Sequence, residues 1–199
     1  MPAYILTGAP GAGKTSMLRL LETFGYTVVE EAASDVIALG QALGHAEPWR
    51  ESTFIDDVAA LQRRRQDAAR VTAGDATVFF DRSPVCTLAL SRYLGFPPPP
   101  FLTREVARIV ADRTYEETVF FIRNQGFIQS TAARKITFED SLAFERLHEE
   151  TYRDLGFRLS DIPAGPLEER VALVRRTLAV EGSPGAGHRD RRARREWVT

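Results

Sequence analysis

The chain alternates short, continuous apolar runs with longer stretches in which apolar residues recur every three or four positions. The apolar runs cover residues 3–7, 26–30, 76–81, 117–123 and 157–163. Continuous apolar runs of this length are typical of strands that are buried on both faces of a parallel sheet. The stretches between them have the period of helices. The pattern therefore predicts an α/β fold with three α/β/α layers around a five-stranded parallel sheet.

Two of the helical stretches predict which residues face the core. After the first apolar run, Met17, Leu21 and Phe24 recur at the spacing of one helix face. A later helix that ends near Gly74 contains the segment QRRRQ at residues 62–66. Because this segment is entirely polar, we expect it to face outward.

The domain organisation follows from length and composition. A chain of 199 residues with 44% hydrophobic residues can bury one sizeable core. We expect one domain over residues 1–180, with a lid around residues 124–137. Residues 181–199 have no apolar period and contain five arginines against three acids, a net charge of +2. We expect them to form a flexible basic tail.

Overall charge and cysteine content limit the possible partners. A formal net charge of -1 and a pI near 6.3 favour neither nucleic acid nor acidic membranes as partners of the whole chain. A nucleic-acid or lipid contact of the tail is a minor alternative. With Cys86 as the single cysteine, no disulfide can form within the chain. No transmembrane run or secretory signal is found, so we expect a cytoplasmic protein. The sequence leaves the oligomeric state open.

Residues 8–16, GAPGAGKTS, carry the chemistry that is best defined by the sequence. They fit the P-loop pattern (Walker A), whose backbone N–H groups bind a polyphosphate at the start of a helix. Lys14 would reach the β- and γ-phosphates, and the Thr15 hydroxyl would bind Mg²⁺. The expected ligands are ATP or GTP with Mg²⁺. The predicted nucleotide-binding residues are Gly8, Ala9, Pro10, Gly11, Ala12, Gly13, Lys14, Thr15 and Ser16.

Lysine usage supports a special role for Lys14. Of the 26 basic residues, only Lys14 and Lys135 are lysines, which leaves 24 arginines. Arginine cannot replace lysine where a compact point charge is needed. The lysine of the P-loop is such a position.

Two further candidates follow the third apolar run. Asp81 ends that run at the edge of the sheet where ligands bind, and a carboxylate there can hold Mg²⁺ or its water. The alternative is that Asp81 or Ser83 only caps the next helix, because Pro84 suits a first helical turn. Arg82 is expected to clamp the acceptor or the transferred phosphoryl group. Its alternative is a surface ion pair.

The two acidic residues after the second apolar run are candidates for a general base. Glu30 and Glu31 lie at the same edge of the sheet. Glu31 is the preferred base, since transfer to an alcohol needs an acceptor for the hydroxyl proton. Two acids at the start of a helix can also serve only to complement its dipole.

The segment after the fourth apolar run predicts a loop that closes over phosphates. It contains Gly126 and small polar residues, followed by Arg134 and Lys135. Arg134 would supply positive charge as the lid closes. An ordinary connector with solvated cations is the alternative. Thr137 has the spacing of a helix cap, so the loop is expected to end there.

The remaining titratable residues carry no assigned chemistry. His45, His148 and His188 have no metal-ligand spacing, so we expect each to be a surface residue. Cys86 lies among apolar residues of a predicted helix and is expected to be buried and inert.

Four segments resemble a known family of P-loop ATPases and kinases. This family is related to the nicotinamide riboside kinase domain of NadR and consists of nucleoside-kinase-like AAA-domain ATPases. The resemblance runs from about residue 3 to residue 180, and DRS looks like the acid-Arg-Ser motif of deoxynucleoside kinases. The segments are ILTGAPGAGKTS, VVEEAASDVI, VFFDRSPVCTLALSRYLG and FERLHEETYRDLGF.

The resemblance implies a nucleoside-kinase type of sheet with strand order 2-3-1-4-5, and ATP or GTP bound with Mg²⁺. It matches Asp81 and Arg82 to the acid-Arg pair, Glu31 to the carboxylate after the second strand, and Arg134 to the lid. Ser34 departs from the arginine that relatives often have after EAA.

Two functions are consistent with these residues. The first is a small-molecule kinase that transfers the γ-phosphoryl group of ATP to a hydroxyl of a nucleoside-like acceptor. In it Lys14, Glu31, Asp81, Arg82 and Arg134 would be catalytic, and Thr15 and Asp81 would hold the metal. The second is an ATP- or GTP-binding switch with slow hydrolysis that acts through a protein or lipid partner. A housekeeping NTPase or an antibiotic-modifying phosphotransferase shares the same features.

Overall fold

The computed structural model describes residues 1–126 and 137–181. Its five strands are β1 (Ala3–Thr7), β2 (Thr27–Val29), β3 (Val78–Asp81), β4 (Thr118–Ile122) and β5 (Arg158–Ile162). They form one parallel sheet in the order β2-β3-β1-β4-β5. The predicted fold class and strand order are therefore confirmed. Arg134, Lys135, most of the predicted lid and almost all of the predicted tail lie outside the described residues.

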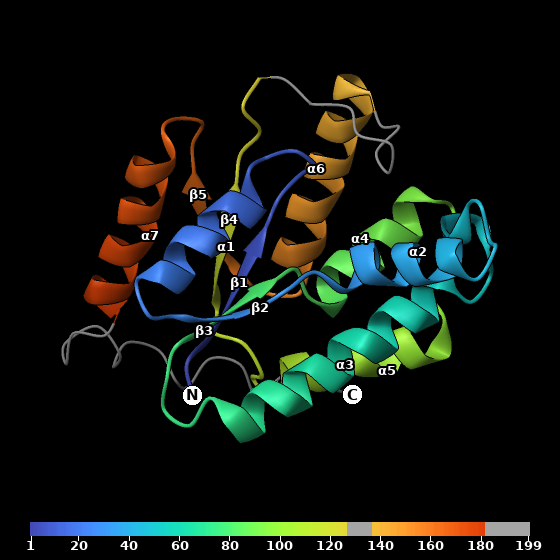
Figure 1. Ribbon diagram of the computed structural model, residues 1–199, viewed down its shortest axis with the longest axis horizontal. Coiled ribbons are helices and arrows are strands. Elements are labelled where there is room, and N and C mark those ends of the chain that lie inside the picture. The colour runs from blue at the N-terminus through green and yellow to red at the C-terminus, as the bar shows by residue number, and fades with distance from the viewer. Residues whose placement is uncertain (127–136, 182–199) are drawn as a thin grey trace.

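Helices connect all the strands, as Figure 1 shows. They are α1 (Lys14–Thr23), α2 (Ala32–Ala42), a short 3-10 helix η1 (Pro48–Arg50), α3 (Phe54–Thr72), α4 (Pro84–Tyr93), α5 (Pro100–Ala111), α6 (Phe138–Asp154) and α7 (Leu167–Glu181). Two of the starts follow the predicted capping chemistry. Ser83 accepts a hydrogen bond from the Val85 amide, and Thr137 accepts one from the Asp140 amide. None of the helices in residues 1–126 and 137–181 is long and apolar enough to cross a membrane.

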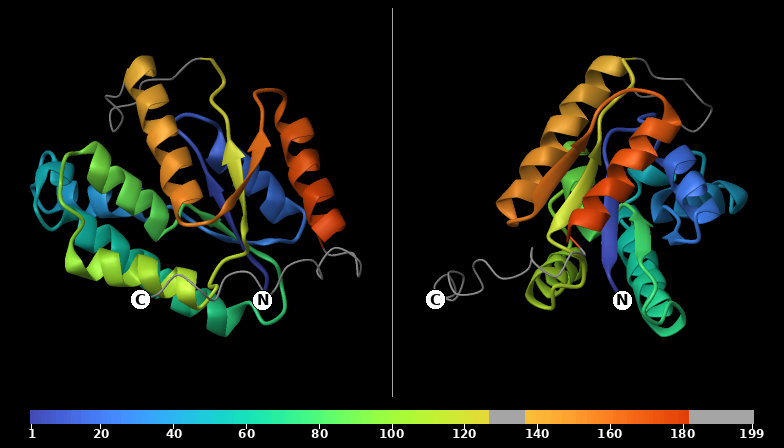
Figure 2. Two further views of the ribbon diagram at one scale, coloured as in Figure 1. Left: turned by 180° about the vertical axis from the view of Figure 1, so that it is seen from behind. Right: turned by 90° about the vertical axis from the view of Figure 1, so that its left-hand side faces the viewer.

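The two faces of the sheet carry separate apolar clusters, because successive strand residues point to opposite faces. In β1, Tyr4 and Leu6 belong to the cluster that packs against α1 and α7. Ala3 and Ile5 belong to the cluster that packs against α3, α4, α5 and α6. The helices thus form an outer layer on each side of the sheet (Figure 2).

A third apolar cluster is built from helices alone. It joins α2 to α3, α4 and α5, and none of its buried residues comes from a strand. Its buried members are Ala32, Phe54, Ile55, Val58, Ala59, Leu88, Leu102 and Val106. Two of these residues, Phe54 and Val58, line the same cavity as the P-loop and Asp81.

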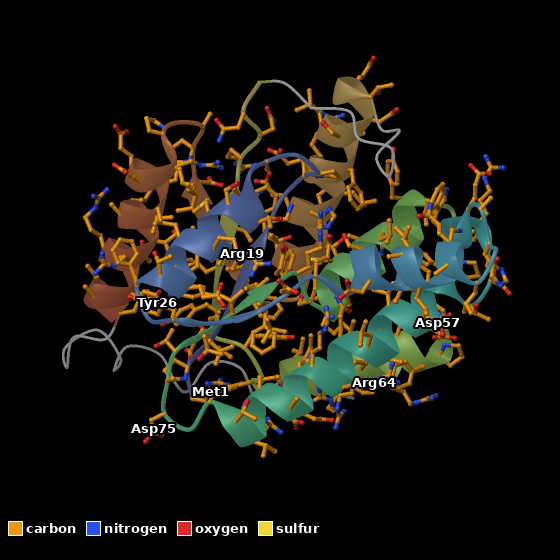
Figure 3. The ribbon with its side chains drawn as sticks, in the orientation of Figure 1. Met1, Arg19, Tyr26, Asp57, Arg64 and Asp75 are labelled. Carbon is orange, nitrogen blue, oxygen red and sulfur yellow. The ribbon has the colours of Figure 1, made fainter. Side chains whose placement is uncertain are left out.

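The outward orientation predicted for residues 62–66 is wrong at both glutamines. Gln62 and Gln66 are buried and lie four residues apart, on one face of α3. Gln62 Oε1 accepts from Thr87 Oγ1 at 2.8 Å, and Gln66 Nε2 donates to the Tyr115 hydroxyl at 2.6 Å. The amides face inward because α3 packs against both α4 and α5. Arg64 lies on the outer side of the helix, as predicted (Figure 3).

The first helix also differs from its predicted face at one position. Met17 and Leu21 are fully buried, but Phe24 caps the C-terminus of α1 and is 50% exposed. The guanidinium carbon of Arg175 in α7 lies 4.2 Å from the centroid of its ring. Beyond the last helical turn the periodicity no longer determines which side a residue faces, which explains the difference.

Candidate functional site

The P-loop joins β1 to α1 and packs closely against the end of β4. At Gly8 the backbone has a φ of 136°, and a Cβ atom there would lie 2.2 Å from the carbonyl oxygen of Ile122. Only glycine can occupy this position without moving β4. Gly13 has a φ of 89° and is the N-cap of α1, with no side chain capping the helix. The loop therefore leaves backbone amides at the start of α1 for a ligand.

Lys14 lies inside this loop. Its side chain is buried, and Nζ donates to the carbonyl oxygens of Gly8 at 3.1 Å and Ala9 at 2.9 Å. Burial, followed by the nearby charge of Arg82, lowers the pKa of Lys14 to about 8. Its neighbours Thr15 and Ser16 are exposed and line a cavity beside the loop.

Asp81 and Arg82 stand next to the P-loop because β3 pairs with β1. Asp81 is opposite Leu6 in the register of the two strands, and the Arg82 amide donates to the Leu6 carbonyl at 3.0 Å. Asp81 is buried and does not cap α4, since Ser83 does so. Arg82 has a φ of 72°, a left-handed conformation that costs a non-glycine residue about 1 kcal/mol or more. Such a conformation in a cleft is compatible with a functional role of Arg82.

Glu31 faces Arg82 across the edge of the sheet. It is the N-cap of α2, and its Oε1 accepts from Arg82 Nε at 2.5 Å. Its other oxygen accepts from the Ser34 hydroxyl at 2.6 Å. Ser34, the position that departs from the family pattern, thus holds the predicted base. The surface ion pair considered for Arg82 is excluded, because its side chain is only 10% exposed.

Electrostatics keep this pair ionised. Burial acts to raise the pKa of Glu31, but the charges of Arg82 and Lys14, together with the hydrogen bonds from Ser34 and Arg82, lower the pKa to about 2. For Arg82, burial acts to lower the pKa, but the nearby Glu31 and Asp81 charges and the hydrogen bond to Glu31 act together to raise it. Both groups therefore carry full charge at neutral pH.

His148 is the residue beside Arg82 whose position the sequence analysis missed. It was predicted to be a surface residue, but it is fully buried in α6. Its Nε2 accepts from Arg82 Nη1 at 3.3 Å, while its Nδ1 donates to the Phe144 carbonyl at 2.9 Å. Burial and then the charge of Arg82 lower the pKa of His148 to about 3, so the ring is neutral. The available signal was its spacing of four residues from both Phe144 and Tyr152, which are also buried.

The other histidines and the cysteine have simpler surroundings. His45 is on the surface, as predicted, and its Nδ1 lies 2.5 Å from Glu51 Oε1. His188 lies outside the described residues. Cys86 is buried, as predicted, with its sulfur 3.1 Å from Thr7 Oγ1 and 3.0 Å from the Tyr152 hydroxyl.

One cavity of about 870 Å³ is lined by the P-loop, Glu31, Asp81 and Arg82. Its charged lining includes Lys14, Glu31, Asp81 and Arg82 from the P-loop and the strand ends, together with Glu47, Arg50 and Asp140. Its apolar lining comes mainly from α2, η1, α3, α4 and α6. The main apolar residues are Ile37, Trp49, Phe54, Val58, Leu90 and Phe144. The cavity therefore combines an anion-binding loop with a surface suited to a planar apolar group.

Sequence comparison identifies the family. The profile of the family described as AAA domain matches residues 3–170. The chain belongs to this AAA domain family. Its P-loop implies nucleotide binding by this AAA domain. No protein of curated function matches the sequence significantly.

Structure comparison shows which solved proteins share the fold of this AAA domain. Deoxyadenosine kinase from M. mycoides with the products dCMP and a flexible dCDP bound matches with a TM-score of 0.58 and 14% identity, over 89% of this chain and 99% of that chain. The same kinase with bound dATP matches with a TM-score of 0.56 and 13% identity, over 90% of this chain and 100% of that chain. At such identities the likeness shows the fold alone.

The residues of the AAA domain fit a magnesium ion that is bound together with phosphates. No group of three or more acidic, histidine or cysteine side chains able to hold a metal occurs in residues 1–126 and 137–181. Mg²⁺ is usually held by one or two protein oxygens together with phosphate oxygens and water. The Thr15 hydroxyl and the Asp81 carboxylate, both at the cavity, are suitable protein oxygens.

The pKa of Lys14 generates a prediction for nucleotide binding. Phosphate anions favour the charged lysine, so the affinity for MgATP should be highest below about pH 8 and weaken as the pH rises through this value. By linkage the loss approaches about tenfold per pH unit above it. Isothermal calorimetry between about pH 7 and pH 9.5 measures this effect. Lys14→Arg is the control, because any binding that it retains should lack this pH dependence.

The contacts of His148 generate a second prediction. In His148→Leu, Arg82 loses an acceptor, and kcat of the nucleotide reaction should fall about tenfold with the KM for ATP nearly unchanged. His148→Gln, which can offer an oxygen to Arg82, should recover part of the rate. Thr151→Val is the matched control, since Thr151 lies on the same helix as His148 and its Oγ1 also accepts from an arginine, Arg92 Nη1 of α4, at 3.1 Å. Equal rate losses in His148→Leu and Thr151→Val would contradict the role of His148.

Proposed function

We propose that this AAA domain is a Mg²⁺-dependent small-molecule kinase that transfers the γ-phosphoryl group of ATP to a hydroxyl of a nucleoside-like acceptor. One observation carries the proposal: the P-loop, the Glu31–Arg82 pair and an apolar surface line the same cavity. Its volume of about 870 Å³ is large enough for a phosphate chain and a second molecule. The resemblance to the nicotinamide riboside kinase domain of NadR supports a nucleoside-like acceptor.

The P-loop binds the phosphates that take part in the reaction. The loop amides and Lys14 bind the β- and γ-phosphates, and Thr15 and Asp81 would hold Mg²⁺. Magnesium, when bound, neutralises charge on the phosphate oxygens. Arg134, which lies outside the described residues, is proposed to add a positive charge at the transferred group. GTP is an alternative donor, because no base-specific contact is assigned.

Glu31 orients the acceptor hydroxyl. Each of its oxygens already accepts one hydrogen bond and has a second lone pair available. With a pKa of about 2, Glu31 is a weak base, so it acts first as a hydrogen-bond acceptor and receives the proton only as transfer proceeds. The acceptor oxygen bonds to the γ-phosphorus while the bond to the bridging oxygen breaks, and ADP leaves. The proton then passes from Glu31 to water.

Arg82 stabilises the phosphoryl group during transfer. Arginine carries five N–H donors, and in the described residues Arg82 uses one on Glu31 and one on His148. The others are available for phosphoryl oxygens. Because Glu31 and His148 hold the guanidinium from two elements, little reorganisation is needed when charge develops.

The alternative function is an ATP- or GTP-binding switch with slow hydrolysis that acts through a protein or lipid partner. A switch requires no second ligand beside the phosphates. In a switch the apolar lining from Ile37, Trp49 and Phe54 can contact only the base of the nucleotide, whereas in a kinase it can also hold a nucleoside-like acceptor. This lining favours the kinase over the switch.

A panel assay distinguishes the two functions. Consumption of ATP and GTP is measured with magnesium, alone and with nucleosides, nicotinamide riboside and hydroxyl-bearing antibiotics, and with Lys14→Ala as the blank. For a kinase we expect nucleosides to raise turnover well above the basal rate, with phosphorylated acceptor as the product. A uniform basal rate across the panel would reject the kinase and favour the switch.

Glu31→Gln tests the assignment of the acceptor-orienting group. Removal of a general base typically slows a reaction by about 10²–10⁴-fold, so kcat should fall by that order. The dissociation constant of MgATP, measured by calorimetry, should change little. Ser34→Ala, which removes only the hydroxyl that supports Glu31, is the matched control and should retain most of the rate. An unchanged kcat in Glu31→Gln would remove this residue from the mechanism.

A further inference from the structure

Arg170 is a buried charge that neither the sequence motifs nor the proposed mechanism uses. It lies in the first turns of α7 and is 4% exposed. Its Nη1 donates to the Ala12 carbonyl of the P-loop at 2.9 Å, and its Nη2 donates to the Arg123 carbonyl at 3.1 Å. Its buried Nε has no hydrogen-bond partner within the described residues. The guanidinium thus bridges the P-loop and the residue that follows β4.

The surroundings of Arg170 differ from those of the partly buried arginines. Arg82, Arg108 and Arg123 each contact a carboxylate. Among residues 1–126 and 137–181, no carboxylate forms an ion pair with Arg170. Burial lowers the pKa of Arg170, yet a guanidinium stays charged in proteins. A buried charge without a counter-ion is unfavourable, so an anion that binds nearby gains from it.

The hydrogen bond to Ala12 also sets the direction of a P-loop amide. In a planar trans peptide the C=O and the following N–H point in opposite directions. Because the Ala12 carbonyl points to Arg170, the Gly13 N–H points away from it. Within the described residues this N–H makes no hydrogen bond. It is one of the amides at the start of α1 that can bind an anion.

Gly13 permits the close approach of the guanidinium. A Cβ atom at Gly13 would lie 3.0 Å from Arg170 Nη1. The cavity lining includes Gly13 but not Arg170. Arg170 therefore supports the loop from outside the cavity, while Gly13 faces it. The packing of α7 on α1, through Val171 and Met17 among others, holds the arginine in place.

We propose that Arg170 is a positioning residue for the polyphosphate of a bound nucleotide. It turns the Ala12 carbonyl away from the anion, directs the Gly13 amide toward it, and adds a buried positive charge behind the loop. The inference rests on nucleotide binding at the P-loop, but not on the identity of an acceptor. It also links the phosphate site to the end of β4 through Arg123.

The test compares Arg170→Met with Arg176→Met. Arg176 is on the same helix and exposed, so it is the matched control for the loss of one positive charge. Binding of MgATP, MgGTP and inorganic tripolyphosphate is measured by calorimetry. We expect Arg170→Met to weaken ATP and tripolyphosphate at least tenfold and alike, because its effect is on the phosphates. Arg176→Met should bind within about twofold of the wild type.

Two further measurements separate positioning from a merely structural role. Arg170→Lys keeps the charge but not the planar fork, and should recover part of the affinity. It also replaces Arg170→Met if that variant does not fold. Thermal unfolding is recorded with and without MgATP, and the nucleotide-induced rise in Tm should shrink in both Arg170 variants. A change in the Tm of the free protein with unchanged affinity for both phosphate ligands would overturn the proposal.

The result for Arg170 does not depend on whether the protein is a kinase. No acceptor is present, so a protein that binds ATP but phosphorylates nothing still gives a decisive result for Arg170. If the wild-type protein binds neither nucleotide nor tripolyphosphate, both proposals are wrong.

Discussion

The buried guanidinium of Arg82 is the charge on which the electrostatics of the cavity depend. It joins three parts of the fold, since Arg82 follows β3, Glu31 caps α2 and His148 belongs to α6. Its field contributes to three pKa shifts: it keeps Glu31 ionised, helps to keep His148 neutral, and lowers the pKa of Lys14. The protonation states of the site therefore form one coupled set rather than independent properties of each residue.

The positive charges of two arginines near the P-loop are balanced in different ways. Arg82 is balanced by Glu31 and presents its remaining donors to the cavity. Arg170 is held by carbonyl oxygens and stays outside the cavity. One charge is thus neutralised before a ligand arrives, whereas in our proposal the other gains its counter-ion from the ligand. Arginine suits both positions because its charge persists after burial and its donors are arranged in a rigid plane.

Local features of the structure could be predicted from the sequence. The strands, the P-loop and the cap at Ser83 depend on neighbouring residues, so their patterns are readable within short segments. The strand order was available only through the family resemblance, because periodicity does not specify which strands pair. The position of Asp81 beside the P-loop followed from its place at a strand end.

Buried polar residues were not predictable in the same way. His148 is 66 positions from Arg82, and Arg170 is 158 positions from Ala12. A polar residue in an amphipathic helix looks solvent-exposed until its distant partner is known, and this is why Gln62 and Gln66 were also assigned to the surface. Only the three-dimensional packing of α3, α6 and α7 reveals these partners.

The separation of the third apolar cluster from the sheet has a consequence for how the protein can diversify. The helices α2, α3 and α4, with η1, supply the apolar wall of the cavity, yet the buried residues of this cluster include none from the strands. Replacements at Ile37, Trp49 or Leu90 can therefore reshape ligand preference while the packing beneath the P-loop is preserved. During evolution, the selectivity for a ligand and the stability of the fold could therefore change almost independently of each other.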